Sequence, residues 1–123
     1  MKKLAALMTL VFPALVFANS NCDKPVNDFD GLYCLNKVYG EADKELNDRY
    51  KELVSLLDSS GKAALKQGQL AWIKQRNSQC SRREESDFFV NLDCATNQTI
   101  QRAQFLQDRI RECKSSGCLN SRL

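Results

Sequence analysis

The sequence predicts an all-α domain: a three-helix antiparallel bundle stapled by disulfides and preceded by a cleaved signal peptide. Three observations favour this fold class. Apolar residues recur every three or four positions in three separate segments, as on one face of an amphipathic helix. Turn-forming residues separate these segments, and all six cysteines follow an apolar N-terminal stretch. Amphipathic helices with short connections pack as antiparallel bundles.

Residues 1–18 have the features of a secretory signal peptide. A short basic start is followed by an apolar run from Leu4 to Phe17, and the segment ends at Ala18 in an A-x-A-like cleavage site. The run is shorter than the ~20 apolar residues that span a bilayer. Lipoprotein processing needs a small residue before the modified cysteine, but Asn21 precedes Cys22. We therefore expect a periplasmic or secreted mature protein that starts near Asn19 and has no membrane anchor.

Helical spacing predicts the first two helices. The first is expected from about Asp30 to Asp58, with apolar residues three or four positions apart at Leu35, Tyr39, Ala42, Leu46, Tyr50, Leu53 and Leu57. Turn residues follow at 58–61, and Ser59 or Ser60 is expected to cap a second helix from about Lys62 to Arg82. One face of that helix mixes large apolar and polar residues: Leu65, Gln69, Trp72, Arg76 and Cys80.

A polar connection is expected at 81–93 and a third helix from about Leu92 to Cys113. Its inward face is predicted to carry Ala95 or Thr96, then Thr99, Ala103, Leu106, Ile110 and Cys113. The expected organisation is therefore a signal peptide at 1–18, a helical domain at 19–113 and an irregular C-terminal tail at 114–123.

The cysteines predict a disulfide framework, because their number is even and the chain is short and exported. Up-down-up order gathers Cys34, Cys80 and Cys94 at one end of the bundle, within reach of Cys22. Cys113 and Cys118 lie at the other end. The favoured set is Cys22–Cys34, Cys80–Cys94 and Cys113–Cys118. The bundle geometry favours the distal pair more than it resolves the other four cysteines.

Composition argues against several functional classes. Without Lys2 and Lys3 the 18 basic residues fall to 16, against 15 acidic ones, and this balance gives no field that would gather nucleic acid. The chain has no histidine, so Ser–His and Cys–His catalytic pairs are excluded. It also lacks a C-x-x-C pair, which argues against a zinc site. We expect a protein that is not an enzyme and uses neither metal nor cofactor.

Three segments together resemble one family of exported helical domains. The motif residues are Asp43, Leu46, Asn47 and Tyr50, then Gln69, Trp72 and Arg76 before Cys80, then Thr99, Arg102 and Leu106 after Cys94. The ordered set is similar to the LprI-like lysozyme-inhibitor family, with its pattern D-x-x-L-N-x-x-Y, Q-x-x-W-[IL]-x-x-R-D-x-x-C and C-x(4)-T-x-x-R-x(3)-L. The resemblance extends from about Cys22 to Leu106, and an early cysteine pair is typical of it.

The chain departs from the family pattern in three places. Asn77 stands where Asp is usual, so a charge pair expected beside Arg76 is missing. The segment between Cys80 and Cys94 carries acidic and aromatic residues in place of glycines, and the Cys113/Cys118 tail is extra. The resemblance implies a binding domain with a protein partner, and lysozyme is the candidate that it suggests.

The polar motif residues have two interpretations. Gln69, Trp72 and Arg76 share one helix face, which is compatible with a ligand site. The other interpretation joins the polar motif residues in a hydrogen-bonded network that fixes the register of the helices. The network is favoured, because polar groups that face other helices are usually satisfied internally.

The segment at 84–93 is the candidate partner-binding loop. Its acidic residues are Glu84, Glu85, Asp87 and Asp93, and Phe88 and Phe89 lie in its middle. A loop pre-ordered by a Cys80–Cys94 bridge would lower the entropy cost of association, and its acids would speed encounter with basic lysozymes. In the other interpretation, the rings pack on the bundle end and the acids are solvated.

Two functions follow from this reasoning. The leading hypothesis is an exported, non-catalytic binding protein that inhibits lysozyme by occluding its cleft. The alternative is a periplasmic interaction or envelope-stress module without inhibitory activity. A protruding acidic loop favours the first, and a flat loop with both phenylalanines buried favours the second.

Overall fold

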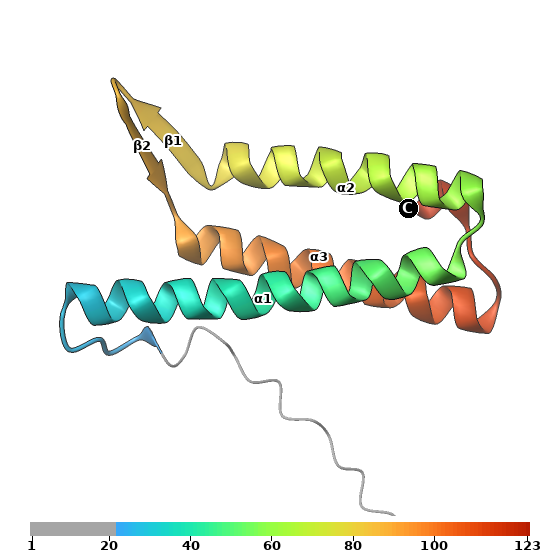
Figure 1. Cartoon of the computed structure of the whole chain (residues 1–123), viewed down its shortest axis with the longest axis horizontal. Helices are drawn as coiled ribbons and strands as arrows, with labels where there is room; N and C mark the ends of the chain where they lie inside the picture. The colour runs from blue at the N-terminus through green and yellow to red at the C-terminus, as the bar shows by residue number, and fades with distance from the viewer. Residues whose placement is uncertain (1–21) are drawn as a thin grey trace, which may run out of the picture.

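The computed structural model describes residues 22–123, so the expected signal peptide and its cleavage site lie outside the described residues. Three long helices, α1 (Asp28–Leu56), α2 (Ser59–Gln79) and α3 (Leu92–Ser115), run up, down and up (Figure 1). Two short strands, β1 (Ser81–Glu84) and β2 (Asp87–Val90), connect α2 to α3, and a 3-10 helix, η2 (Asn120–Arg122), follows α3. The predicted disulfide-linked three-helix bundle is confirmed.

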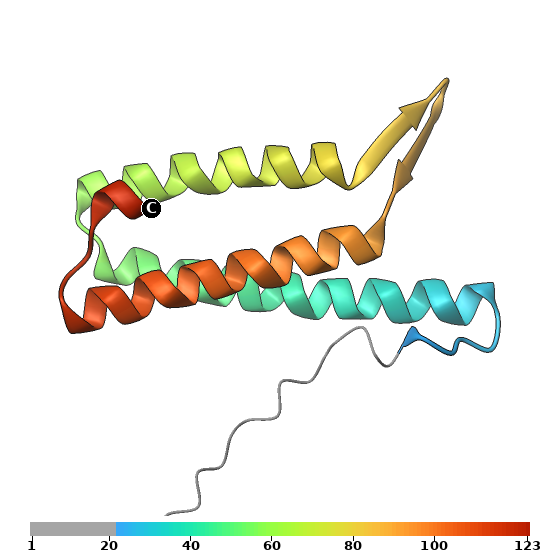
Figure 2. The ribbon, with the colours of Figure 1, turned by 180° about the vertical axis from the view of Figure 1, so that it is seen from behind.

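Helices α1 and α3 lie side by side along much of their length (Figures 1 and 2). Small buried side chains let their backbones approach: Ala42 on α1, and Ala95, Thr99 and Ala103 on α3. Towards the end of α1 the core is made of larger buried residues, Leu46, Leu53, Leu106 and Ile110. Full burial of one such side chain stabilises the fold by about 1.5–3 kcal/mol, so this contact supplies much of the apolar core.

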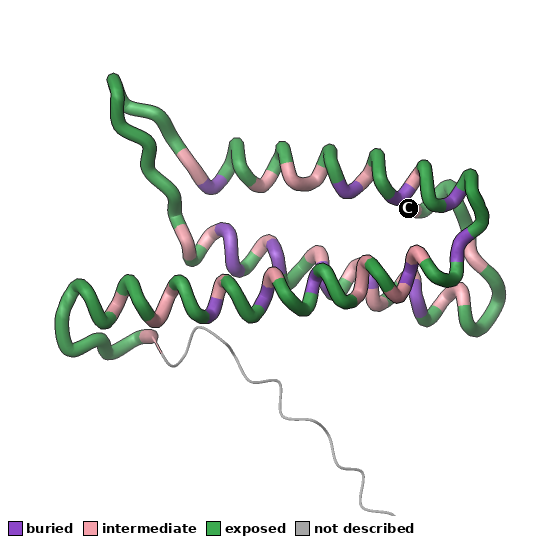
Figure 3. The backbone as a smooth tube through the Cα atoms, viewed as in Figure 1, coloured by how far each residue is buried: buried purple, intermediate pink, exposed green. Residues whose placement is uncertain are grey.

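Helix α2 lies farther from that pair and has fewer buried residues (Figure 3). It buries Gly61, Leu65 and Gln69. Leu65 belongs to the core cluster, and the half-buried Trp72 packs against it. The contacts of α2 therefore depend on a few long side chains that reach across to its neighbours.

Helix α2 begins three residues earlier than expected because Asp58 caps it. The Asp58 carboxylate accepts a hydrogen bond from the Gly61 N–H at 2.7 Å, so the prediction that Ser59 or Ser60 forms the cap is wrong. This bond, and a second from the Asn120 amide, hold the pKa of Asp58 below its usual 3.8. The helix ends at Gln79 and not at Arg82, because the chain enters β1 directly after Cys80.

The C-terminal tail folds back onto α2 (Figure 2). Helix α3 continues to Ser115, the Cys113–Cys118 disulfide turns the chain, and η2 contacts α2. A Cβ atom on Gly61 would lie 2.7 Å from Asn120 Oδ1 and 3.1 Å from Asp58 Oδ1, so a side chain there would displace the Asn120 side chain where the tail crosses. The tail, expected to be irregular, thus contains one short helix that packs on the bundle.

Candidate functional site

The segment between Cys80 and Cys94 forms an antiparallel β-hairpin that projects from the end of the bundle (Figure 1). The polar connection expected at 81–93 thus contains two strands that the sequence analysis did not predict. Cross-strand pairs join Ser81 to Val90, Arg82 to Phe89, Arg83 to Phe88 and Glu84 to Asp87. The Phe-Phe-Val run favours a strand, but the tip has no glycine or asparagine, the residues that usually mark a two-residue hairpin loop.

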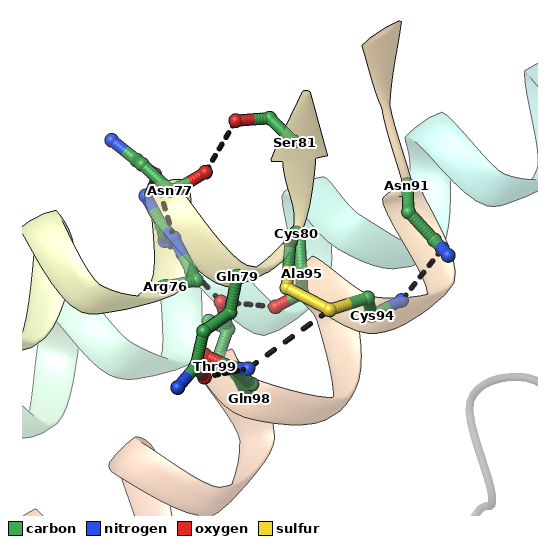
Figure 4. Close-up of a disulfide and its surroundings, with 10 residues drawn as sticks. All are labelled: Arg76, Asn77, Gln79, Cys80, Ser81, Asn91, Cys94, Ala95, Gln98 and Thr99. Carbon is green, nitrogen blue, oxygen red and sulfur yellow. Dashed lines mark hydrogen bonds between the residues drawn. A yellow bond between two sulfur atoms is a disulfide. The ribbon is translucent and has the colours of Figure 1, made fainter. Parts of the chain in front are cut away.

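The base of the hairpin is fixed to two helices (Figure 4). A disulfide joins Cys80, at the end of α2, to Cys94 in the first turn of α3. The Asn91 N–H donates to the Cys80 carbonyl at 2.7 Å, and the Asn91 side chain accepts from the Cys94 N–H at 3.0 Å, which caps α3. The Ser81 hydroxyl also donates to the Asn77 carbonyl. The strands are thereby held in one orientation relative to the bundle.

The hairpin exposes three consecutive large apolar residues. Phe88, Phe89 and Val90 are 61%, 43% and 53% exposed. Directly opposed residues of a β-pair lie on the same face, so Arg83 accompanies Phe88 and Arg82 accompanies Phe89. The Arg82 guanidinium lies 4.9 Å from the centre of the Phe89 ring. Both rings thus keep a large part of their surface accessible to a partner.

The charges of the hairpin are mixed. Glu84, Glu85 and Asp87 are exposed around its tip, but β1 also carries Arg82 and Arg83. Arg82 forms an ion pair with Glu84 at 2.8 Å. Asp93 lies in the first turn of α3 and not on the hairpin. The acidic patch expected from the sequence is therefore smaller than its four carboxylates suggested.

Glu85 is the one non-glycine residue with a positive φ among those described, at 53°. This left-handed conformation is uncommon for a residue with a side chain and is usually met by glycine at the first central position of such a turn. The tip of the hairpin therefore holds modest backbone strain, at the point farthest from the bundle.

Four of the polar motif residues connect α2 to α3 across the bundle. The Arg102 Nε donates to Gln69 Oε1 at 2.9 Å, and the Arg76 Nη1 donates to Thr99 Oγ1 at 3.3 Å. Both guanidinium groups lie near the Trp72 ring, with centroid distances of 4.9 Å for Arg76 and 5.9 Å for Arg102. Burial lowers the pKa of Arg102. These contacts connect α2 to α3 and set the distance between the two helices.

The α1 members of the motif lie apart from that network. Asp43, Asn47 and Tyr50 line a shallow groove of about 160 Å³ between α1 and α2, with Trp72 and Arg76 opposite. Asn47 is exposed, and its amide donates to Asp43 at 3.4 Å. Leu46 and Leu106 are buried in the core. The motif thus divides into core, network and groove residues.

A second pocket lies at the base of the hairpin, where all three helices contribute. It has a volume of about 240 Å³ and is lined by Tyr39 of α1, Arg76 of α2, Phe88 and Val90 of β2, and Leu92 of α3. This pocket was not predicted from the sequence, because no strand was expected within the polar connection at 81–93. In a β-strand alternate side chains share a face, so the strand conformation of β2 brings Phe88 and Val90 together in the pocket wall.

Within residues 22–123, no group of three or more histidine, cysteine, aspartate or glutamate residues is placed to hold a metal ion. The helices of the same region include none that is long and apolar enough to cross a membrane. All six cysteines are paired, as Cys22–Cys34, Cys80–Cys94 and Cys113–Cys118. This is the pairing favoured from the sequence.

Comparison with known protein families identifies the chain's family. The family model for lysozyme inhibitor LprI matches residues 22–106, a span that contains the hairpin and the first two disulfides. No curated protein and no solved structure matches the chain. The Cys113–Cys118 tail lies outside the matched span.

Proposed function

Because the chain belongs to the LprI lysozyme-inhibitor family, we propose that it is an exported, non-catalytic protein that binds lysozyme and blocks its cleft with the β-hairpin. A protein that acts by occlusion needs a stiff projection with accessible anchoring side chains. The hairpin has this form, since it extends beyond the helices and is tied to both α2 and α3.

The observation that carries the proposal is the exposure of Phe88 and Phe89 on this anchored projection. Aromatic side chains are enriched among the few residues that dominate binding energy at interfaces. Each ring would contribute about 1.5–3 kcal/mol if a partner removed it from water. The Cys80–Cys94 bridge orders the strands beforehand, which lowers the entropy lost on association.

Charge has a smaller part in the proposal. The carboxylates of Glu84, Glu85 and Asp87 would face the basic surface of a lysozyme and raise the association rate. The two arginines of β1 offset most of that charge, and Arg82 already pairs with Glu84. We therefore assign affinity mainly to the phenylalanines and encounter rate to the acids.

The alternative function, an envelope interaction module without inhibition, anticipated buried phenylalanines in a flat loop. The exposed rings favour the inhibitor instead. The three disulfides support an oxidising compartment, which fits a periplasmic or secreted protein without a membrane anchor.

The decisive experiment is a lysozyme activity assay with the oxidised mature protein and a Phe88→Ser/Phe89→Ser variant. We expect the inhibition constant to rise about 100-fold or more, because two interface anchors are lost. Leu70→Ser is the matched control, since Leu70 is equally exposed but lies on α2. If the double variant inhibits as well as the wild type, the hairpin is not the inhibitory element. A wild-type protein that does not inhibit at micromolar concentration would reject lysozyme as the target.

The contribution of charge is tested by a Glu84→Ala/Glu85→Ala/Asp87→Ala variant. Its association rate should fall at low salt and approach that of the wild type at high salt, because salt screens exposed charges. An association rate equal to the wild-type value at every ionic strength would remove the acids from the mechanism.

A further inference from the structure

The pocket at the base of the hairpin combines an apolar wall with a single cation. Phe88 and Val90 of β2 and Leu92 of α3 supply the wall, and Tyr39 of α1 closes it on the opposite side. Arg76 is the one charged residue among the described residues that line this pocket. The lining therefore favours a ligand that is apolar over most of its surface and negative at one end.

Arg76 keeps unused hydrogen-bonding capacity. Its Nε and Nη2 donate to Asn77 Oδ1 at 3.2 and 3.1 Å, and its Nη1 donates to Thr99 Oγ1 at 3.3 Å. A guanidinium has five N–H donors, so two remain after these bonds. Each acceptor is neutral. The Thr99 hydroxyl gives its own proton to the Ala95 carbonyl at 2.7 Å, which leaves its oxygen free to accept from Arg76.

The positive charge of Arg76 is also uncompensated. In the described part of the chain no ion pair joins Arg76 to a carboxylate. Asp43, the acidic residue that shares the neighbouring groove with Arg76, accepts a hydrogen bond from Asn47. The guanidinium lies instead near two rings, 5.8 Å from the centre of Tyr39 and 4.9 Å from that of Trp72. These rings fix its position without neutralising it.

We propose that this pocket binds a carboxylate carried by a compact apolar group. The carboxylate accepts from the two free N–H groups of Arg76, and the apolar part packs against Phe88, Val90 and Leu92. Hydrogen bonds between a guanidinium and a carboxylate are roughly twice as strong as neutral ones and favour a fixed geometry. This inference does not depend on lysozyme binding.

Selectivity follows from the same arrangement. A neutral ligand of equal shape fills the apolar wall but gains no charge-assisted bond, and a basic ligand is repelled by Arg76. The pocket should therefore discriminate by charge more than by shape. It should also depend on the hairpin, because two of its wall residues come from β2.

The test uses phenylacetate as the probe and phenylacetamide as a neutral ligand of the same shape. Nuclear magnetic resonance titration of the oxidised mature protein should show phenylacetate binding about 10-fold more tightly, as expected for a charge-assisted bond. The shifted resonances should include Tyr39, Phe88 and Leu92. Equal affinity for the two probes, or no saturable shift with either, would overturn the proposal.

Asn77→Asp provides a matched variant that keeps the fold. The new carboxylate would replace an amide oxygen already 3.1 Å from the guanidinium and would form an internal ion pair with Arg76. Phenylacetate affinity should then fall about 10-fold, while the melting temperature is unchanged or higher. Gln75→Glu is the control, because it adds the same charge to an exposed position of α2 that does not line this pocket. Binding that Asn77→Asp leaves unaltered would refute the role of Arg76.

A further probe separates two sources of the ligand. N-acetylphenylalanine carries its carboxylate as the end of a peptide chain does. Tighter binding than phenylacetate would assign the site to a chain terminus of a protein partner, and weaker binding would assign it to a free small acid. Both outcomes support a carboxylate site, whereas failure of both probes to bind would exclude it.

Discussion

The contact between α1 and α3 and the contact of α2 with its neighbours are built from different kinds of side chain. Between α1 and α3 the buried side chains are mostly apolar, short ones such as Ala42 and Ala103 together with leucines such as Leu106, and the backbones come close. Across α2 the connecting side chains are long. Gln69 and Arg76 reach α3 through hydrogen bonds to Arg102 and Thr99.

Because of this difference, one contact determines most of the global stability and the other determines how the hairpin is positioned. The α1–α3 contact holds most of the buried apolar residues. Helix α2 depends on Leu65, on the arginine network and on ties at its two ends, which are the tail at Gly61 and the disulfide at Cys80. Regions with few buried contacts open first in native proteins. Because β1 continues directly from α2, one strand of the hairpin is attached to the less stable of the two contacts.

The largest expected effect is a loss of stability in Leu106→Ala. Leu106 is fully buried on α3, and deletion of such a side chain costs about 2–5 kcal/mol. The equivalent change Leu65→Ala on α2 should cost less, because α2 can shift to close the cavity. Urea denaturation monitored by circular dichroism measures both. A larger loss for Leu65→Ala would contradict the comparison.

The next effect is removal of the disulfide at the hairpin by Cys80→Ser/Cys94→Ser. The bridge closes a loop with a sequence separation of 14 residues. On the chain-entropy model such a loop is worth about 3 kcal/mol. Hydrogen exchange should accelerate in α2 and the hairpin more than in α1. Removal of Cys113–Cys118, whose separation is 5 residues, should cost less. Uniform acceleration across all three helices would show that α2 is not an independent unit.

A smaller loss is expected from Gln69→Ala. This change removes the acceptor of the Arg102 Nε and leaves a half-buried guanidinium with a lost bond. An unsatisfied polar group of this kind costs about 1–3 kcal/mol. Gln75→Ala, at an exposed position of the same helix, should change the free energy of unfolding by less than about 0.5 kcal/mol. Equal losses of unfolding free energy in the two variants would show that the hydrogen bond between Gln69 and Arg102 does not stabilise the position of α2.

The smallest effect is the pH dependence contributed by Asp58 at the start of α2. Its folded-state pKa lies below 3.8, so its stabilising contribution is complete above about pH 4 and is lost as pH falls through the folded pKa. Asp58→Asn retains a capping side chain but does not titrate. The difference in melting temperature between wild type and Asp58→Asn should therefore narrow below pH 4. A constant difference would show that the carboxylate charge is not involved.

The helices were predictable because they depend on local periodicity, and the up-down-up order of those helices favoured the Cys113–Cys118 pair more than it resolved the other four cysteines. The expected inward face of α3, including Thr99, Ala103, Leu106 and Ile110, is buried in the structure. Apolar spacing identifies such a face without knowledge of the partner helix. Helix ends were less accurate, since Asp58 caps α2 one residue before Ser59, and the Asn120 amide of the tail also donates to the Asp58 carboxylate.

The hairpin and its pocket could not be predicted from the same rules. A four-residue strand pair has little intrinsic stability, and Glu85-Ser86 is not a recognisable hairpin turn. The register instead depends on the Cys80–Cys94 bridge and on the Asn91 bond to Cys80, both of which are nonlocal. The placement of Arg83 beside Phe88 and of Arg82 beside Phe89 follows only from that register.

Asn91 completes the β-ladder with its backbone and starts α3 with its side chain. One residue therefore performs both tasks, and no flexible linker separates the hairpin from α3. A force that a partner applies to the tip of the hairpin would therefore be transmitted to α3. The hairpin would then tilt only together with the first turn of α3, and force applied to the bound complex would reach the α1–α3 contact directly.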